Sequence, residues 1–180
     1  MTTEIIISGF GGQGILSMGK ILAYCALMDG KEATWMPAYG PEQRGGTANV
    51  TVIVSDKPIS SPILSRYDIA IVLNQPSLDK FQHRVKPGGT LIYDCFGISS
   101  PPTRTDIQVF SIDAMAKATE LQNAKVFNMV VLGALLGTHP ITSTDALRRV
   151  LEKTLPERSH SLIPLNLQAV EEGRKMVSQA

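Results

Sequence analysis

The residues best suited to bind a ligand form a glycine-rich loop near the N-terminus. Residues 9–14 read GFGGQG and satisfy the pattern G-x-G-x-x-G, which in nucleotide-binding proteins joins a strand to a helix. Glycine allows positive φ angles and a close approach of the backbone to a ligand. The N-terminus of the following helix offers unpaired N–H groups to an anion. The spacing is compatible with an anion-binding loop and with a purely structural turn alike.

A second stretch, residues 37–46, reads PAYGPEQRGG and carries an acid, an amide and a base in succession. Two prolines and three glycines in ten residues exclude regular structure and predict a loop of definite shape. In one interpretation it is a solvated turn in which Glu42 and Arg44 pair weakly. We favour a functional loop, because binding residues are concentrated in such segments.

The elements around the first loop indicate an open α/β sheet. Ile5 to Ile7 form a β-branched run typical of a buried strand. Apolar residues at helical spacing then predict a helix over residues 15–28. A second strand is expected over residues 32–36, ending at Pro37 without the acid that would hold a ribose hydroxyl. The nicotinamide-binding interpretation therefore lacks the second of the two features that define it, the acid after the second strand.

Strands and helices alternate through most of the remaining chain, which predicts a single domain, residues 1–180. The fold class is a three-layer α/β/α sandwich with an open, mostly parallel or mixed sheet of about six strands. The predicted strands are residues 47–55, 67–74, 90–95 and 107–112, and the predicted helices are residues 76–84, 113–121, 129–137, 142–155 and 165–177.

Local signals refine these elements. Asn74 or Gln75, Asp113, Asn128 and Thr144 are the expected helix caps, and residues 86–89 (KPGG) are read as a plain turn. Gly133 and Gly137, four positions apart, are expected to let their helix lie flat on the sheet.

Composition excludes several classes of protein. The 180 residues carry a net charge of +1, without the basic patch that nucleic-acid binding needs. The longest apolar run, residues 129–136, is too short to cross a membrane, and we expect no signal segment before the first strand. We expect a cytoplasmic protein with buried free cysteines, Cys25 and Cys95. Without C-x-x-C, H-E-x-x-H or nucleophile-elbow motifs, we predict no metal site and no catalytic residue.

Three blocks together resemble a known family. They are GFGGQGI from residue 9, MPAYGPEQRGGTAN from residue 36, and VFNMVVLGALLG from residue 126. In order and spacing they are similar to the γ subunit of 2-oxoacid:ferredoxin oxidoreductases, over about residues 5–137. The middle block looks most like the 2-oxoglutarate members, then the branched-chain (2-oxoisovalerate) members.

The resemblance implies a subunit of a larger enzyme. Such complexes decarboxylate a 2-oxoacid on thiamine diphosphate, pass electrons through iron–sulfur clusters to ferredoxin, and release an acyl-coenzyme A. Thiamine diphosphate, magnesium and the clusters are expected in partner subunits (α, β and a ferredoxin-like δ). The γ subunit is expected to bind coenzyme A and cover the active site, with no membrane or nucleic-acid partner.

The resemblance also implies roles for particular residues. The predicted contacts to coenzyme A come from the glycine loop and one cation: Gly9, Gly11, Gly12, Gln13, Gly14 and Arg44. The face toward the catalytic subunits is expected to comprise Tyr39, Glu42, Gln43, Gly45, Gly46 and Thr47. Two alternatives remain open: a free-standing Rossmann-like oxidoreductase that binds NAD or FAD, and a purely structural assembly subunit.

Overall fold

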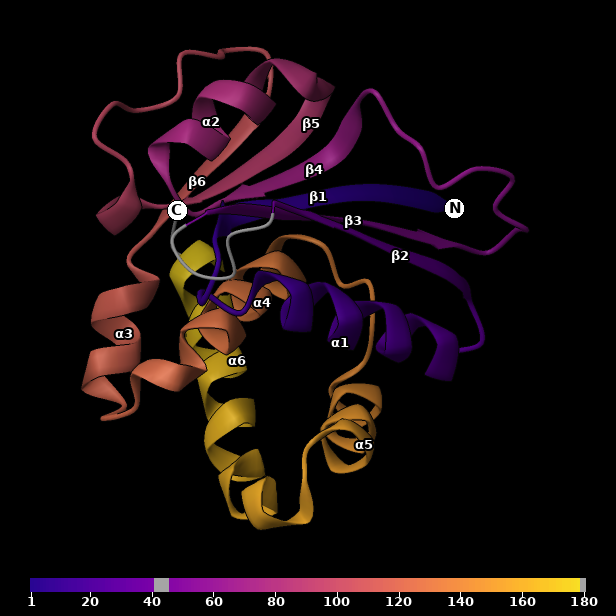
Figure 1. Cartoon of the computed structure of the whole chain (residues 1–180), viewed down its shortest axis with the longest axis vertical. Helices are drawn as coiled ribbons and strands as arrows, with labels where there is room; N and C mark the ends of the chain where they lie inside the picture. Colours follow the sequence, from indigo (N-terminus) through magenta and orange to yellow (C-terminus); the bar gives the residue numbers. More distant parts are fainter. Residues whose placement is uncertain (41–45, 179–180) are drawn as a thin grey trace.

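The computed structural model describes residues 1–40 and 46–178 and places six strands in one sheet. The order across the sheet is β2-β3-β1-β4-β5-β6 (Figure 1). The strands are β1 (Thr2–Phe10), β2 (Glu32–Tyr39), β3 (Thr47–Ser55), β4 (Tyr67–Val72), β5 (Val85–Asp94) and β6 (Gln108–Ile112). Strands β1, β4, β5 and β6 pair in parallel, and β3 runs antiparallel to both β1 and β2. The predicted α/β fold is confirmed, and its sheet is mixed.

The described helices cover the two faces of the sheet unequally, as Figure 1 shows. One face is covered by most of the α-helices, whereas α2 lies on the other. The helices are α1 (Ile15–Met28), α2 (Gln75–Phe81), α3 (Ala114–Glu120), α4 (Phe127–Thr138), α5 (Thr144–Thr154) and α6 (Ile163–Ser178). Short 3₁₀ helices at residues 82–84, 95–97, 124–126 and 157–162 complete the described chain.

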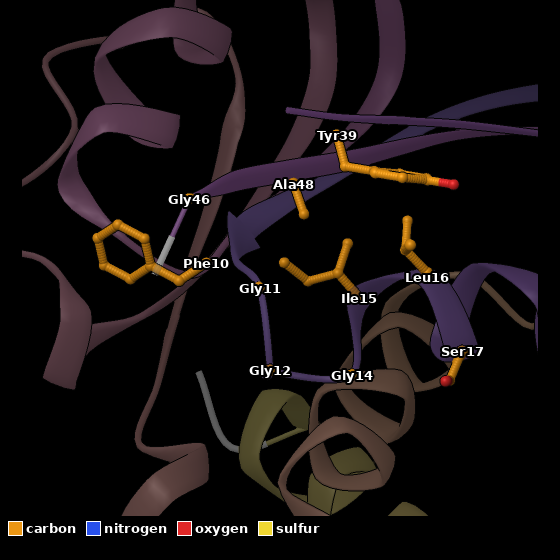
Figure 2. Close-up of a pocket in the computed structure, with 10 residues that line it drawn as sticks. All are labelled: Phe10, Gly11, Gly12, Gly14, Ile15, Leu16, Ser17, Tyr39, Gly46 and Ala48. Atoms are coloured by element: carbon orange, nitrogen blue, oxygen red, sulfur yellow. The ribbon is translucent and has the colours of Figure 1, made fainter. Parts of the chain in front are cut away.

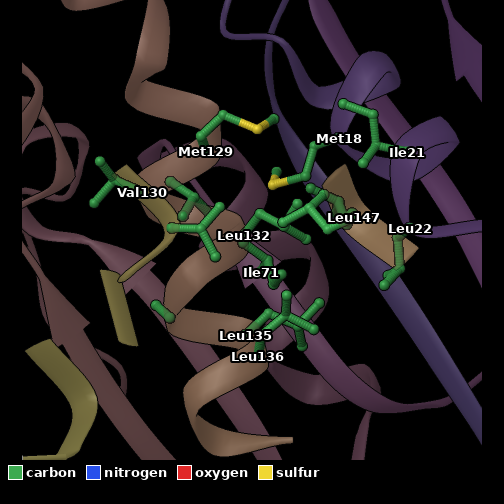
Figure 3. Close-up of a cluster of buried hydrophobic side chains, with 14 of the residues drawn as sticks. Met18, Ile21, Leu22, Ile71, Met129, Val130, Leu132, Leu135, Leu136 and Leu147 are labelled. Atoms are coloured by element: carbon green, nitrogen blue, oxygen red, sulfur yellow. The ribbon is translucent and has the colours of Figure 1, made fainter. Parts of the chain in front are cut away.

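The isoleucine run shows how the sequence builds two cores. Successive side chains of a strand point to opposite faces of its sheet. Ile5 and Ile7 therefore join the large cluster under α1, α4 and α5, while Ile6 joins a smaller cluster under α2. Figure 3 shows the large cluster, where Met18 of α1 lies near Leu132 of α4. This packing fixes where α1, and hence the glycine loop before it, sits against the sheet.

Two predicted boundaries are wrong because proline and glycine are tolerated in particular strand positions. Strand β2 continues through Pro37 to Tyr39, whose partner in β3 is Ala48. An edge strand accepts proline when the missing N–H faces away from its neighbour. Residues 86–89 belong to β5, where Gly88 adopts φ 75° and donates its N–H to the backbone carbonyl oxygen of Asp106.

The helix caps were predicted with mixed success. Asn74 and Asp113 accept hydrogen bonds from the N–H groups of Ser77 and Ala116, as expected. Helix α5 is capped by Ser143 instead of Thr144. Helix α4 begins at Phe127, so Asn128 lies inside its first turn and is no cap.

The paired glycines of α4 pack against a helix and not against the sheet. A Cβ atom on Gly133 would lie 2.1 Å from the carbonyl oxygen of Val170 in α6, and one on Gly137 would lie 2.6 Å from Val177. From the other side, a Cβ atom on Gly173 would lie 2.0 Å from the carbonyl oxygen of Val130. The expectation that these glycines flatten α4 on the sheet is wrong: they bring the backbones of α4 and α6 together.

The two cysteines differ in environment. Cys25 is buried in α1, where burial, assisted by the charge of Asp29, raises the pKa of its thiol to about 12. Cys95 follows β5 and is exposed, which corrects the prediction that both cysteines are buried. Its thiol pKa is also raised, first by partial burial and then by Asp113 and Asp94.

We predict that one thiol per chain reacts in the folded protein. Only the thiolate attacks a disulfide reagent, and Cys25 is both inaccessible and protonated at pH 8. Titration with Ellman's reagent should therefore count one thiol before unfolding and two after. Cys95→Ser should remove the reaction of the folded protein, and rapid reaction of that variant would contradict the assignment.

Candidate functional site

The glycine loop leaves β1 at Phe10 and enters α1 at Ile15. Gly12 and Gly14 have φ angles of 99° and 76°, which residues with a side chain rarely adopt. Gly9 has another role: it lies within β1, and a Cβ atom there would be 2.5 Å from Oε1 of Gln13. The structural interpretation thus applies to Gly9, whereas Gly12 and Gly14 remain open to the ligand-facing one.

Internal hydrogen bonds shape the loop. Gly11 donates its N–H to the carbonyl oxygen of Gly46 at 2.9 Å. The Gln13 amide accepts from the Phe10 N–H at 2.7 Å and donates to the Leu73 carbonyl oxygen at 3.4 Å. The N–H of Gly11 and the amide of Gln13, predicted to face a ligand, are therefore engaged within the protein.

Free donors lie one step further along the chain. The first helical hydrogen bond of α1 runs from Met18 N–H to the Gly14 carbonyl oxygen. Within the described residues, the N–H groups of Ile15, Leu16 and Ser17 have no acceptor, as expected of a first helical turn. Gly14 caps α1 without a side-chain hydrogen bond, and no acid lies in that turn. The partial positive charge of this helix end is thus left for an anion.

A pocket of about 460 Å³ lies between this helix end and the strands β2 and β3 (Figure 2). In Figure 2, Ile15 and Leu16 point from α1 toward Ala48 and Tyr39, with Gly12 and Gly14 below them. The lining residues are Phe10, Gly11, Gly12, Gly14, Ile15, Leu16, Ser17, Tyr39, Gly46 and Ala48. The glycine loop therefore meets Tyr39 and Gly46, from the second stretch singled out in the sequence, at one site.

Register explains this meeting. Phe10, the last residue of β1, pairs with Thr47, the first residue of β3. Gly46, just before β3, consequently lies beside the glycine loop. Parallel strands place ligand sites at their carboxyl ends, and the loop after β1 and the end of β2 both lie there.

Not every predicted site residue can be placed. Gln43, Arg44 and Gly45, together with Glu42, lie outside the described residues. Tyr39 is 66% exposed and lines the pocket, whereas Thr47 is exposed but is not among the pocket residues.

Sequence reasoning missed Leu16 and Ser17. The position of Ser17, three residues after the last loop glycine, was a usable signal, because it falls in the first helical turn. Leu16 has a further role: its carbonyl oxygen accepts the indole N–H of Trp35 at 3.2 Å, tying α1 to β2.

The described residues contain neither a cluster of metal ligands nor a membrane-spanning helix. Across residues 1–40 and 46–178, no three or more His, Cys, Asp or Glu side chains gather in a way that could hold a metal ion. None of the helices in that part of the chain combines the length and apolar character needed to span a bilayer. Cys25 and Cys95 do not fit an iron–sulfur cluster, which takes four cysteine ligands.

With this geometry established, comparison with known proteins assigns the family. The sequence pattern described as pyruvate ferredoxin/flavodoxin oxidoreductase matches residues 4–176. The chain belongs to this oxidoreductase family. The resemblance seen in the three sequence blocks is confirmed.

Relatives within the oxidoreductase family differ in the substrate they are named for. The chain is 37% identical over 94% of its length to ketoisovalerate oxidoreductase subunit VorA of Methanothermobacter thermautotrophicus, but spans only 35% of that protein. It is 34% identical to 2-oxoglutarate synthase subunit KorC of Methanocaldococcus jannaschii, covering 99% of this chain and 96% of that one.

Solved structures of the family share the fold. The γ subunit of a keto/oxoacid ferredoxin oxidoreductase from Geobacter sulfurreducens superposes with a TM-score of 0.86 at 30% identity, covering 100% of this chain and 98% of that one. A 2-oxoglutarate:ferredoxin oxidoreductase from Magnetococcus marinus, solved with 2-oxoglutarate, coenzyme A and succinyl-CoA bound, gives a TM-score of 0.89 at 25% identity. That match covers 99% of this chain and 31% of the other.

Proposed function

We propose that this chain is the γ subunit of a 2-oxoacid:ferredoxin oxidoreductase and contributes the coenzyme A side of an active site completed by other subunits. The observation that carries the proposal is the meeting of the glycine loop with Tyr39, Gly46 and Ala48 at one open pocket, where Gly11 donates a hydrogen bond to Gly46. The pocket combines free N–H donors with apolar and aromatic walls. Coenzyme A has matching parts, namely phosphates and a less polar pantetheine arm.

The division of labour follows from what the chain can hold. Its two cysteines cannot supply the four ligands of a cluster, so the iron–sulfur clusters are assigned to partner subunits. On the family resemblance, thiamine diphosphate and magnesium are likewise assigned to the α, β and ferredoxin-like δ partners, with ferredoxin as the acceptor. Within this chain, the donors of α1 bind and orient an anion, and Tyr39 belongs to the face toward the catalytic subunits. Arg44 remains a proposed cation of the site.

Among 2-oxoacids, we rank 2-oxoglutarate first. The relative named for 2-oxoglutarate matches this chain along nearly its whole length, as does part of the structure that holds 2-oxoglutarate and coenzyme A. The branched-chain substrate is the second candidate, favoured by the higher identity to the ketoisovalerate subunit.

Ser17→Asp in the assembled complex tests the proposal. The substitution places a carboxylate beside the free N–H groups of α1, where it should satisfy the helix end and repel a phosphate. We expect the KM for coenzyme A to rise about tenfold at low ionic strength, with the KM for the 2-oxoacid unchanged. Because salt screens this repulsion, the effect should shrink at higher ionic strength.

Ser17→Ala is the matched control, since it removes the hydroxyl without adding charge. It should leave the KM for coenzyme A within about twofold, because the hydroxyl is exposed and the backbone donors remain. A Ser17→Asp complex with unchanged KM for coenzyme A would overturn the proposed contact. Impaired assembly at unchanged KM would favour a structural subunit, and tight binding of NAD or FAD by the full chain would favour the free-standing oxidoreductase.

A further inference from the structure

We propose that Lys125 and Asn128 form a second, phosphate-facing wall of this site, on the α4 side of the glycine loop. The inference deepens the proposed function and rests on it. It assigns a binding residue, Asn128, to a block of sequence, residues 126–137, that otherwise has only a structural role.

The first observation is a second pocket that shares the loop. It has a volume of about 250 Å³, and it is lined by Gly12, Gln13, Gly14, Met115, Ala124, Lys125, Phe127 and Asn128. Gly12 and Gly14 also line the larger pocket. The glycine loop therefore separates the two pockets, and a phosphate bound at the loop faces groups from both.

The second observation concerns Asn128. Because α4 begins at Phe127 after the cap residue Val126, the Asn128 amide has no capping role. It is half-buried and makes no hydrogen bond to the described residues. It lies directly over the loop, since a Cβ atom on Gly14 would be 2.7 Å from its Nδ2. An asparagine inside a helix costs stability relative to alanine, and here no internal hydrogen bond compensates.

The third observation concerns charge. Lys125 is exposed, and its ammonium group forms no ion pair with the described part of the chain. It is the single charged side chain among the residues described as lining either pocket. Neither α1 nor α4 has an acid in its first turn, so no nearby carboxylate on these turns opposes an anion.

Together these groups match a phosphate ester. Lysine supplies a mobile point charge, the amide supplies directed donors, and the α1 turn supplies backbone N–H groups. A neutral thiol would gain little from the lysine. The pair should therefore distinguish coenzyme A from an uncharged pantetheine arm.

The test uses the assembled complex with coenzyme A as the varied substrate. Lys125→Ala should raise the KM for coenzyme A about tenfold and weaken its dependence on salt, because one screened charge is lost. Asn128→Asp should raise the KM for coenzyme A at least as much, because aspartate has nearly the shape of asparagine but carries a charge that repels a phosphate. A carboxylate in the first turn of α4 should also preserve or increase thermal stability, so misfolding would be recognised. The KM for the 2-oxoacid should not change.

Lys153→Ala is the matched control, because Lys153 is an exposed lysine of α5 that lines a separate groove beside α1. Its complex should keep the original KM. If Lys125→Ala and Asn128→Asp leave the KM for coenzyme A unchanged while Ser17→Asp raises it, the second wall is wrong and the proposed function stands. If all three leave it unchanged, the contact between this chain and coenzyme A is wrong as well.

Discussion

Gly133→Ala is expected to lower the free energy of unfolding by about 3 kcal/mol, near the upper end of overpacking effects. The added Cβ atom would lie 2.1 Å from the Val170 carbonyl oxygen. Backbone atoms of a packed helix cannot move aside as a side chain can, so α4 and α6 must separate. Alanine gains up to about 1 kcal/mol in helix propensity, which does not offset this cost.

Thermal unfolding measures the effect, with an expected loss of about 6–12 °C in Tm for a chain of this size. Gly137→Ala is the matched comparison in the same helix, because its closest contact is a side-chain carbon of Val177 that has some freedom to shift. It should destabilise less than Gly133→Ala. Equal losses, or a stabilised Gly133→Ala variant, would show that backbone contact between these helices is not limiting.

The second large effect is a dependence of stability on pH that arises at Asp94. This carboxyl group, at the end of β5, is 1% exposed and accepts a hydrogen bond from the Ala114 N–H at 2.9 Å. Burial raises its pKa from 3.8 to about 6 despite that bond. The folded protein thus retains a proton that the unfolded chain releases at lower pH. The resulting stabilisation is complete below pH 4 and disappears as the pH rises past 6.

Asp94→Asn isolates this contribution. Asparagine cannot ionise, so the stability of the variant relative to the original protein should rise between pH 4.5 and 7.5, by up to about 3 kcal/mol. Urea unfolding at several pH values measures the difference, and subtraction removes the other titrating groups. A difference that stays constant across this range would show that Asp94 has an ordinary pKa in the folded protein.

The parts of the fold that local chemistry dictates were predictable. The isoleucine run, the helix over residues 15–28 and the strand over residues 47–55 match the structure, because periodicity and glycine boundaries act within the segment itself. The caps at Asn74 and Asp113 were likewise readable, since each side chain bonds an N–H only three residues away.

The errors arose where a distant part of the chain decides the outcome. Pro37 extends a strand because β3 lies on one side only, and Asn128 is no cap because α4 starts at Phe127, two residues before the predicted start. Gly133 serves α6, which is more than thirty residues further along the chain. None of these contacts leaves a periodic signal, because they depend on tertiary packing.

The site shows the same division. Residues 9–14 and the end of β2 lie together because of the sheet register. From the sequence, only the family resemblance implied that these two segments meet. Gly11 and Gln13 use their polar groups in hydrogen bonds within the protein, whereas Ser17 lines the pocket. This difference depends on the exact path of the loop. A motif identifies such a segment but not which of its atoms are free.

Pro37 also has a consequence for the exposed edge of the sheet. Strand β2 forms one border of the sheet, and an open border can recruit a strand from another copy and start aggregation. Since proline has no N–H, it interrupts the row of donors that an incoming strand would need. The same residue that extends β2 to the pocket thus protects this border of the sheet against pairing with another copy.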